Sequence, residues 1–290
     1  MEISESEFTV AADDGHVIHG VRWAAVGVSP KGAVQIAHGR AEHGRRYRPM
    51  AQALARAGYH VLAPDDRGHG PSALKDGTLG DFGPRGFAAV VDDMARVSRY
   101  IRQQGAEGLP LLLFAHSMGS FAAQYFLLDH SAAVDGIVLS GTAAVDLRNP
   151  GRPGSVAVPF NTGIADPRTE FDWLSRDPAV VDAYVADPLC GFALTAASTA
   201  SIYADADRVA DPAAYRNVRR ELPLALITGD RDPVNHFLLW FDALAARLRA
   251  FGFLDVSTHV YGGARHEPVN ERNRGEVLAN LIAWFDRVAV

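Results

Sequence analysis

Short apolar runs alternate with longer amphipathic stretches along most of the chain. The runs predict buried strands at 33–37, 59–63, 111–115 and 136–139. The amphipathic stretches predict helices at 47–57, 87–104 and 118–129. Continuous apolar strands separated by helices are typical of a parallel sheet that is covered on both faces. Ahead of this pattern, residues 8–12 and 16–24 predict an antiparallel pair, because Asp13-Asp14-Gly15 suits a tight hairpin turn.

The alternation stops near Gly141 and resumes at Leu222. The last part of the chain predicts strands at 224–228 and 254–260 and helices at 237–249 and 276–288. Residues 142–221 between them are rich in Pro, Asp and aromatics and fit no strand–helix unit. A structureless loop of that length is improbable in a compact domain. We therefore predict an α/β core formed by 1–141 and 222–290, with 142–221 inserted as a cap over the carboxyl ends of the strands.

Composition bounds the class of protein. With 290 residues, 48% of them hydrophobic, the chain can bury a sizeable core. The net charge of −6 comes from mixed signs and gives no electrostatic reason to expect a nucleic-acid partner. Cys190 is the single cysteine, so no internal disulfide can form. No apolar run reaches the ~18 residues of a membrane helix, and the acidic N-terminus does not resemble a secretory signal. We expect a cytoplasmic globular protein.

The strongest chemical signal is an apolar strand that runs into Ala115-His116-Ser117-Met118-Gly119 and then into a helix. This resembles the nucleophile elbow of α/β-hydrolases, G-x-S-x-G, which exposes a serine hydroxyl on a sharp strand-to-helix turn. The small residues two positions before and two positions after Ser117 keep side chains out of the turn. One position departs from the pattern, because Ala115 stands where glycine is usual.

A serine hydroxyl needs a base to take its proton and an acid to orient that base. In α/β-hydrolases the acid and then the histidine follow the serine along the chain. The loop after strand 224–228 offers two acids, Asp230 and Asp232, and the loop after strand 254–260 contains His266. These loops are the expected places for the acid and the base.

Two other patterns are interpreted as structural. His38, Glu42 and His43 follow the strand at 33–37, but their spacing matches no metal site, so we predict none. The segment Gly68-His69-Gly70-Pro71-Ser72-Ala73 contains a permissive dinucleotide fingerprint, which must open a helix at once. Pro71 and the glycines after it argue against a regular helix, so we predict a turn and no cofactor.

Several motifs together resemble the monoacylglycerol lipase and lysophospholipase-like group of α/β-hydrolases. The motifs are His38-Gly-x-x-Glu42-His43-x-x-Arg46-Tyr47, Asp65-x-Arg67-Gly-x-Gly70-x-Ser72, His116-Ser117-Met118-Gly119, Gly229-x-x-Asp232 and His266. The G-x-x-D spacing of this family selects Asp232 as the acid and leaves Asp230 as a loop residue. The resemblance also implies a lid, no cofactor, and an oxyanion hole made by the backbone amides of Met118 and Arg40.

The resemblance implies a serine carboxylic-ester hydrolase that acts on monoacyl lipid esters through an acyl-enzyme. Transient contact with lipid surfaces would accompany such a substrate. Two alternatives stay open: a small-ester or amide hydrolase without long-chain preference, and, more remotely, a non-catalytic binding protein of the same fold.

The apolar side chains of the insert have two possible places, the wall of an acyl pocket or the core of the cap. They are Phe160, Phe171, Trp173, Leu174, Leu189 and Phe192. We expect most of them to form the core of the cap and two or three to face the substrate. The candidates for substrate contact are Phe160, Trp173, Leu174 and Phe192.

Overall fold

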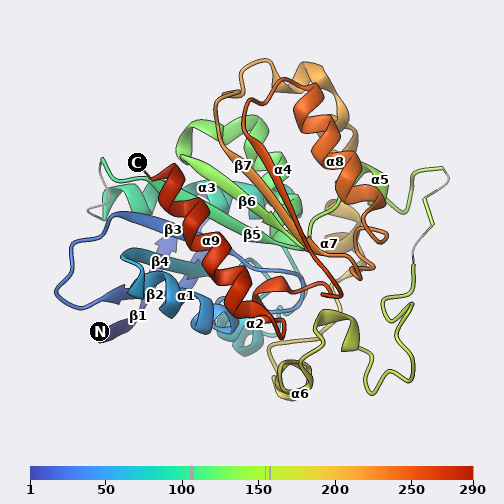
Figure 1. Ribbon diagram of the computed structural model, residues 1–290, viewed down its shortest axis with the longest axis horizontal. Coiled ribbons are helices and arrows are strands. Elements are labelled where there is room, and N and C mark those ends of the chain that lie inside the picture. Colours follow the sequence, from blue (N-terminus) through green and yellow to red (C-terminus); the bar gives the residue numbers. More distant parts are fainter. Residues whose placement is uncertain (105–107, 154, 157, 290) are drawn as a thin grey trace.

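One twisted sheet lies at the centre of the chain (Figure 1). The computed structural model describes residues 1–104, 108–153, 155–156 and 158–289. The sheet contains β1 (Ile3–Ala11), β2 (Val17–Ala25), β3 (Gly32–Ala37), β4 (Tyr59–Pro64), β5 (Leu111–His116), β6 (Gly136–Ser140), β7 (Leu224–Gly229) and β8 (Val256–Tyr261). Their spatial order is β1-β2-β4-β3-β5-β6-β7-β8. Only the pairs β1–β2 and β2–β4 are antiparallel among these described strands, so the predicted mostly parallel sheet is confirmed.

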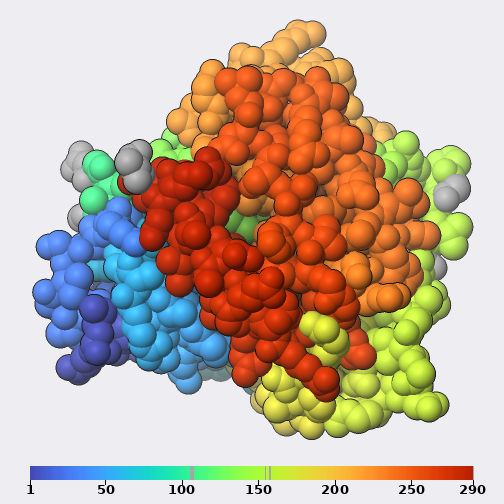
Figure 2. Space-filling view, viewed as in Figure 1, coloured from blue at the N-terminus to red at the C-terminus, as the bar shows by residue number. Residues whose placement is uncertain are grey.

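Helices cover both faces of the sheet, as the continuous apolar strands predict. On one face lie α1 (Arg48–Arg56) and α9 (Arg274–Val288); on the other lie α3 (Phe87–Gln103), α4 (Met118–His130) and α8 (Leu239–Ala250). Strand β5 shows that both faces of the sheet are buried. Leu112 and Phe114 pack on the side of α1 and α9, and Leu111 and Leu113 pack on the opposite side. Figure 2 shows α9, in red, running across the molecular face that it covers. Within the described ranges, no helix is long and apolar enough to cross a membrane.

The short connections have local causes that the sequence partly indicates. The predicted hairpin forms at Asp13-Asp14-Gly15, where Gly15 takes a φ of 86° and the amide of Ala12 donates to the carbonyl of His16 at 2.8 Å. The predicted helix at 237–249 begins later, at Leu239. His236, Phe237 and Leu238 precede it with φ of 58°, 53° and 80°, so three left-handed residues delay the helix.

The prediction that the segment after Gly70 forms only a turn is wrong. Residues Gly70–Asp76 form the short helix α2. Pro71, the second residue of the helix, is compatible with it, because a proline in the first turn loses no intrahelical bond. Gly77 then ends α2 with a φ of 69°. A Cβ on Gly70 would lie 2.2 Å from a carboxylate oxygen of Asp65, so this glycine packs against the protein itself.

Residues 142–221 contain short helices, and no strand among their described members. They are α5 (Val145–Arg148), η3 (Asp172–Leu174), α6 (Pro178–Ala186), α7 (Ala196–Ser201), η4 (Ala206–Ala210) and η5 (Pro212–Tyr215). In Figure 1 this segment runs from yellow-green to light orange. Both of its ends join the core, because Val145 and Tyr215 belong to the same hydrophobic cluster as Leu113. The limits 142 and 221 of the cap stay a prediction.

Candidate active site

Ser117 occupies the turn where β5 ends and α4 begins. Its φ of 50° and ψ of −116° are strained for a residue with a side chain. Backbone bonds hold the turn: the amide of Ser117 donates to the carbonyl of Ser140 at 2.9 Å, and that of Gly119 donates to the carbonyl of His38 at 3.1 Å. A Cβ on Gly119 would lie 2.5 Å from the carbonyl oxygen of Ala37. The second small position of the motif is therefore a steric requirement of this turn.

Ala115 shows that the turn tolerates alanine at the first small position. The residue is fully buried within β5, where it lies opposite Ala37 on β3 and Leu139 on β6. Its methyl group packs in the core on the α3 and α4 side of the sheet. The departure from glycine is thus absorbed by the core.

His266 and Asp232 lie together, and His266 lines the same cavity as Ser117. The Nδ1 atom of His266 is 2.9 Å from Oδ2 of Asp232, and both side chains are buried. The carboxylate of Asp232 also accepts from Thr228 Oγ1 at 3.1 Å, from Asn235 Nδ2 at 3.2 Å and from the amide of Val234 at 2.8 Å. These donors fix the carboxylate in one orientation. A proton on Nδ1 of the neutral ring leaves Nε2 free to accept another.

Asp230, the other candidate acid, lies apart from this pair. Its Oδ1 accepts from the amide of Gly263 at 2.7 Å, and Arg231 lies beside it with Nε at 3.8 Å. Gly263 belongs to the loop that leads to His266. Asp230 therefore shapes this loop, and Asp232 is the acid that touches the histidine.

The loop after β3 reaches the same turn. A Cβ on Gly39 would lie 3.1 Å from Cβ of Ser117, so the two backbones are in close approach. Arg40 and Met118, whose amides are predicted to form the oxyanion hole, line one cavity with Ser117. Met118 is also the first residue of α4, where backbone amides point away from the helix and favour negative charge. The assignment of these two amides stays a prediction.

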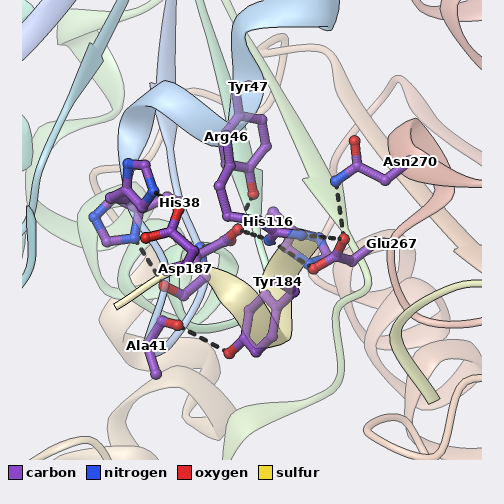
Figure 3. A network of polar contacts seen from close by, with 12 residues as sticks. His38, Ala41, Arg46, Tyr47, His116, Tyr184, Asp187, Glu267 and Asn270 are labelled. Atoms are coloured by element: carbon purple, nitrogen blue, oxygen red, sulfur yellow. Dashed lines mark hydrogen bonds and ion pairs between the residues drawn. The ribbon is translucent and has the colours of Figure 1, made fainter. Parts of the chain in front are cut away.

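A buried ion-pair network, which we call the Arg46 triad, consists of Glu42, Arg46 and Glu267. Figure 3 labels Arg46 and Glu267. The guanidinium of Arg46 binds Glu267 through two bonds of 2.8 and 3.0 Å, and it also binds Glu42. Glu42 accepts in addition from the amide of Gly39 and from the hydroxyl of Tyr47 at 2.8 Å. The triad thus joins the loop after β3 to the residue that directly follows His266.

Sequence analysis identified Glu42, Arg46 and Tyr47 as part of a motif but missed Glu267. Arg46 and Glu267 lie 221 positions apart. The one available signal was that Glu267 adjoins His266. Sequence analysis also missed Tyr184 on α6, whose hydroxyl donates to the carbonyl of Ala41 at 2.9 Å and whose ring lies 4.7 Å from the Arg46 guanidinium (Figure 3).

Burial and neighbouring charges shift the pKa values of Glu42 and His116. Burial alone would raise the pKa of Glu42, but the Arg46 guanidinium beside it, with weaker help from His116, holds the pKa at about 2. Burial lowers the pKa of His116 to about 4, and His266 reinforces the shift. The rings of His116 and His266 are 4.7 Å apart. At neutral pH the site therefore holds a charged Glu42 and a neutral His116.

The segment 142–221 is bound directly to the loop that contains His266. The amide of His266 donates to the carbonyl of Trp173 at 3.3 Å, and that of Glu267 donates to the carbonyl of Leu174 at 2.9 Å. The Trp173 ring lies 4.9 Å from the His266 ring and stacks on Phe160 at 4.3 Å.

A cavity of about 530 Å³ opens at Ser117 and His266. The four candidates for substrate contact, Phe160, Trp173, Leu174 and Phe192, all line the cavity. Phe171 lines it as well. The expectation that most of the insert's apolar side chains form its own core is therefore wrong, because Leu189 alone among the six lies outside this wall. Other apolar residues of the segment, such as Val209, Tyr215 and Val218, are buried in the core cluster that the segment shares with the sheet.

One trio within the described residues could offer ligand atoms to a metal ion. These atoms of His43, Asp187 and Cys190 lie within 4.8 Å of one another. His43 Nε2 instead bonds Oδ2 of Asp187 at 2.9 Å. Burial raises the pKa of the Cys190 thiol, so the thiolate that a metal prefers is disfavoured. We assign no metal to this trio, and the absence of a metal stays a prediction.

Comparison with known proteins gives a consistent set of relatives. The model of the serine aminopeptidase S33 family matches residues 28–273. The monoacylglycerol lipase of Mycolicibacterium smegmatis is 32% identical over 264 residues, which cover 88% of each chain. The crystal structure of a thermostable carboxyl esterase from Bacillus coagulans with glycerol superposes with a TM-score of 0.85 at 28% identity, covering 100% of both chains. A monoacylglycerol lipase from Paleococcus ferrophilus shares the fold at 21% identity, with a TM-score of 0.67 and coverage of 100% and 99%.

The Arg46 triad predicts a large and specific loss of stability. Replacing Arg46 with Met leaves two buried carboxylates without their cation, which typically costs about 3–5 kcal/mol. The control is Arg48→Met, since Arg48 is half exposed and its pair with Glu5 is worth about 1 kcal/mol at most. Urea unfolding followed by tryptophan fluorescence measures both losses. Equal losses in the two variants would contradict the structural role of the triad.

Proposed function

The chain belongs to the serine aminopeptidase S33 family of α/β-hydrolases and is a carboxylic ester hydrolase, and we propose that it cleaves monoacyl lipid esters. The proposed activity is of the monoacylglycerol lipase or lysophospholipase type. We further propose that Ser117, His266 and Asp232 form the catalytic triad. A cytoplasmic location and transient contact with lipid surfaces stay predictions from the sequence.

One observation carries the proposal: Ser117, on its strained turn, lines the same cavity as His266, and the far side of the His266 ring is bonded to Asp232 at 2.9 Å. This arrangement supports Ser117 as the nucleophile, His266 as its base and Asp232 as the group that orients the base. The three residues come from the carboxyl ends of β5, β7 and β8, where open α/β sheets bind their ligands.

In the first step the Ser117 hydroxyl attacks the ester carbonyl while Nε2 of His266 takes the hydroxyl proton. The tetrahedral oxyanion accepts hydrogen bonds from the amides of Met118 and Arg40. The charged Asp232 carboxylate stabilises the imidazolium that forms. His266 then gives the proton to the leaving alcohol, and the acyl group stays on Ser117 as an ester.

In the second step water enters after the alcohol has left. His266 accepts a proton from the water, whose oxygen attacks the acyl carbonyl. The bond to Ser117 breaks, the proton returns to the serine oxygen, and the free acid leaves. His116 lies against His266 and is neutral at the working pH, so it adds no positive charge that would oppose the imidazolium.

The cavity supports a substrate with one acyl chain. Its volume of about 530 Å³ lies within the range of small-molecule sites. Phe160, Trp173, Leu174 and Phe192 give it an apolar wall next to the triad. The names of the relatives, among them monoacylglycerol lipase and a probable lysophospholipase, support the same class. The alternative to this substrate class is a small-ester hydrolase without long-chain preference, and the chain-length experiment below distinguishes the two.

Replacing Ser117 with Ala should lower the rate of ester hydrolysis by about 10⁴-fold or more, because no other group replaces the hydroxyl. The measurement is release of p-nitrophenol from acyl esters, together with labelling by a fluorophosphonate probe. Wild-type protein should label with one probe per chain and the variant should not. A wild-type protein that neither labels nor hydrolyses any ester would point to the non-catalytic binding protein.

A matched pair of variants distinguishes the two candidate acids, Asp232 and Asp230. Asp232→Asn should lower kcat by about 10⁴-fold, because the amide no longer holds His266 in the right tautomer. Asp230→Asn should cost only about 1 kcal/mol of stability, the value of its bond to the Gly263 amide. Steady-state kinetics and thermal unfolding are measured for both. A larger kinetic loss at Asp230 would refute the assignment of the acid.

The apolar wall predicts a change in chain-length preference. Phe160→Ala should lower kcat/KM for the decanoate ester relative to the acetate ester by about tenfold, since apolar contact is lost only with the longer chain. Leu189→Ala is the control, because this cap residue lies outside the cavity wall. Phe160 is preferred to Trp173, which also contacts the catalytic histidine. An unchanged ratio of the two esters, with thermal stability intact, would place the acyl pocket elsewhere.

A further inference from the structure

Arg148 is a cation that faces the catalytic cavity without a partner. It is the last residue of α5, and it lines the same cavity as Ser117 and His266. Its Nε atom is buried and, among the described residues, has no hydrogen-bond acceptor; nor does its guanidinium form an ion pair there. A buried donor without a partner costs free energy, which a bound acceptor would recover.

The acids around Arg148 are occupied by other arginines. Asp146, two residues earlier and buried, binds Arg152 at 2.8 Å and Arg247 at 2.6 and 3.0 Å. Glu42 and Glu267, which also line the cavity, are both bound to Arg46.

Two further charged residues line the cavity, and neither neutralises Arg148. Glu170 is exposed and lies beyond ion-pair distance from Arg148 within the described part of the chain. Arg40 is exposed and carries the same sign of charge. The Arg148 guanidinium is therefore free to bind an anion from solution.

An aromatic wall connects Arg148 to the catalytic histidine. The Trp173 ring lies 4.9 Å from the His266 ring, Phe160 stacks on Trp173 at 4.3 Å, and the Arg148 guanidinium lies 6.0 Å from the Phe160 ring. A molecule that follows this wall from the reacting carbonyl meets apolar surface first and a cation at its end. The wall thus selects an ester that has an apolar span and an anionic group.

We propose that Arg148 forms a subsite for an anionic oxygen group, a carboxylate or a phosphate, carried by the ester substrate. This inference rests on the proposed function, which it narrows from monoacyl lipid esters in general to those that carry an anionic group. A guanidinium suits this task because its planar donors bind carboxylate and phosphate oxygens in pairs. The phosphate would come from the alcohol side of the ester, as in lysophosphatidic acid; the carboxylate would come from the far end of the acyl chain.

The test compares anionic and neutral substrates of matched length in four proteins: wild type, Arg148→Met, Arg148→Lys and Arg152→Met. The first pair is lysophosphatidic acid and the monoacylglycerol of the same chain. The second is the p-nitrophenyl half-ester of decanedioic acid and p-nitrophenyl decanoate. Arg152→Met is the matched control, since it removes a cation from the same loop that does not line the cavity.

We expect Arg148→Met to lower the ratio of kcat/KM for the anionic and the neutral substrate by about tenfold or more in at least one pair. Arg148→Lys should restore part of the ratio, and Arg152→Met should leave it within about twofold. A loss in the first pair alone identifies the headgroup as the source of the anion, and a loss in the second alone identifies the acyl end. An unchanged ratio in both pairs, or an equal fall in Arg152→Met, would overturn the proposal.

A binding measurement separates this proposal from the proposed function. Decyl phosphate, decanoate and decanol are titrated calorimetrically into wild type and Arg148→Met. Tighter binding of either anion, lost in the variant, supports the subsite even if the wild-type protein hydrolyses no ester. Equal binding of the anions by the two proteins would refute the subsite while leaving ester hydrolysis intact.

Discussion

The pairing of one buried arginine with two carboxylates is the constraint on which the site depends. Arg46 binds Glu42, which holds the loop of the predicted oxyanion hole through the amide of Gly39, and Glu267, which directly follows His266. The loop beside Ser117 and the loop of His266 are thereby linked by a single side chain. Charges buried in this way are costly unless every partner is present, so the loops can adopt only the arrangement that keeps all three groups together.

The strain at Ser117 is maintained by the same packing. A positive φ on a residue with a side chain persists only where its neighbours over-determine it. Here the bond from the Gly119 amide to the carbonyl of His38 links the turn to the loop that Glu42 organises. The elbow and the Arg46 triad are therefore linked through the loop after β3.

The segment 142–221 is part of the site as well as its cover. Its backbone carbonyls at Trp173 and Leu174 accept from the amides of His266 and Glu267, and Tyr184 packs on Arg46. Movement of this segment would therefore disturb both His266 and the Arg46 triad. Its buried residues Val209, Tyr215 and Val218 belong to the core cluster of the sheet, which holds the segment against the sheet.

The sequence by itself determined the features that depend on neighbours along the chain. The strands of the sheet follow from apolar runs, and the elbow at Ser117 from small residues around one serine. The preference for Asp232 over Asp230 came from the G-x-x-D spacing of the family that the chain resembles. Only the tertiary structure decided which residues meet across the fold. It decided the bond between Arg46 and Glu267, the lack of a partner for Arg148 Nε among the described residues, and the place of Phe160 and Trp173 in the cavity wall. A residue's local pattern records its backbone preference and its need for burial, but not which distant group completes its charge or covers its surface.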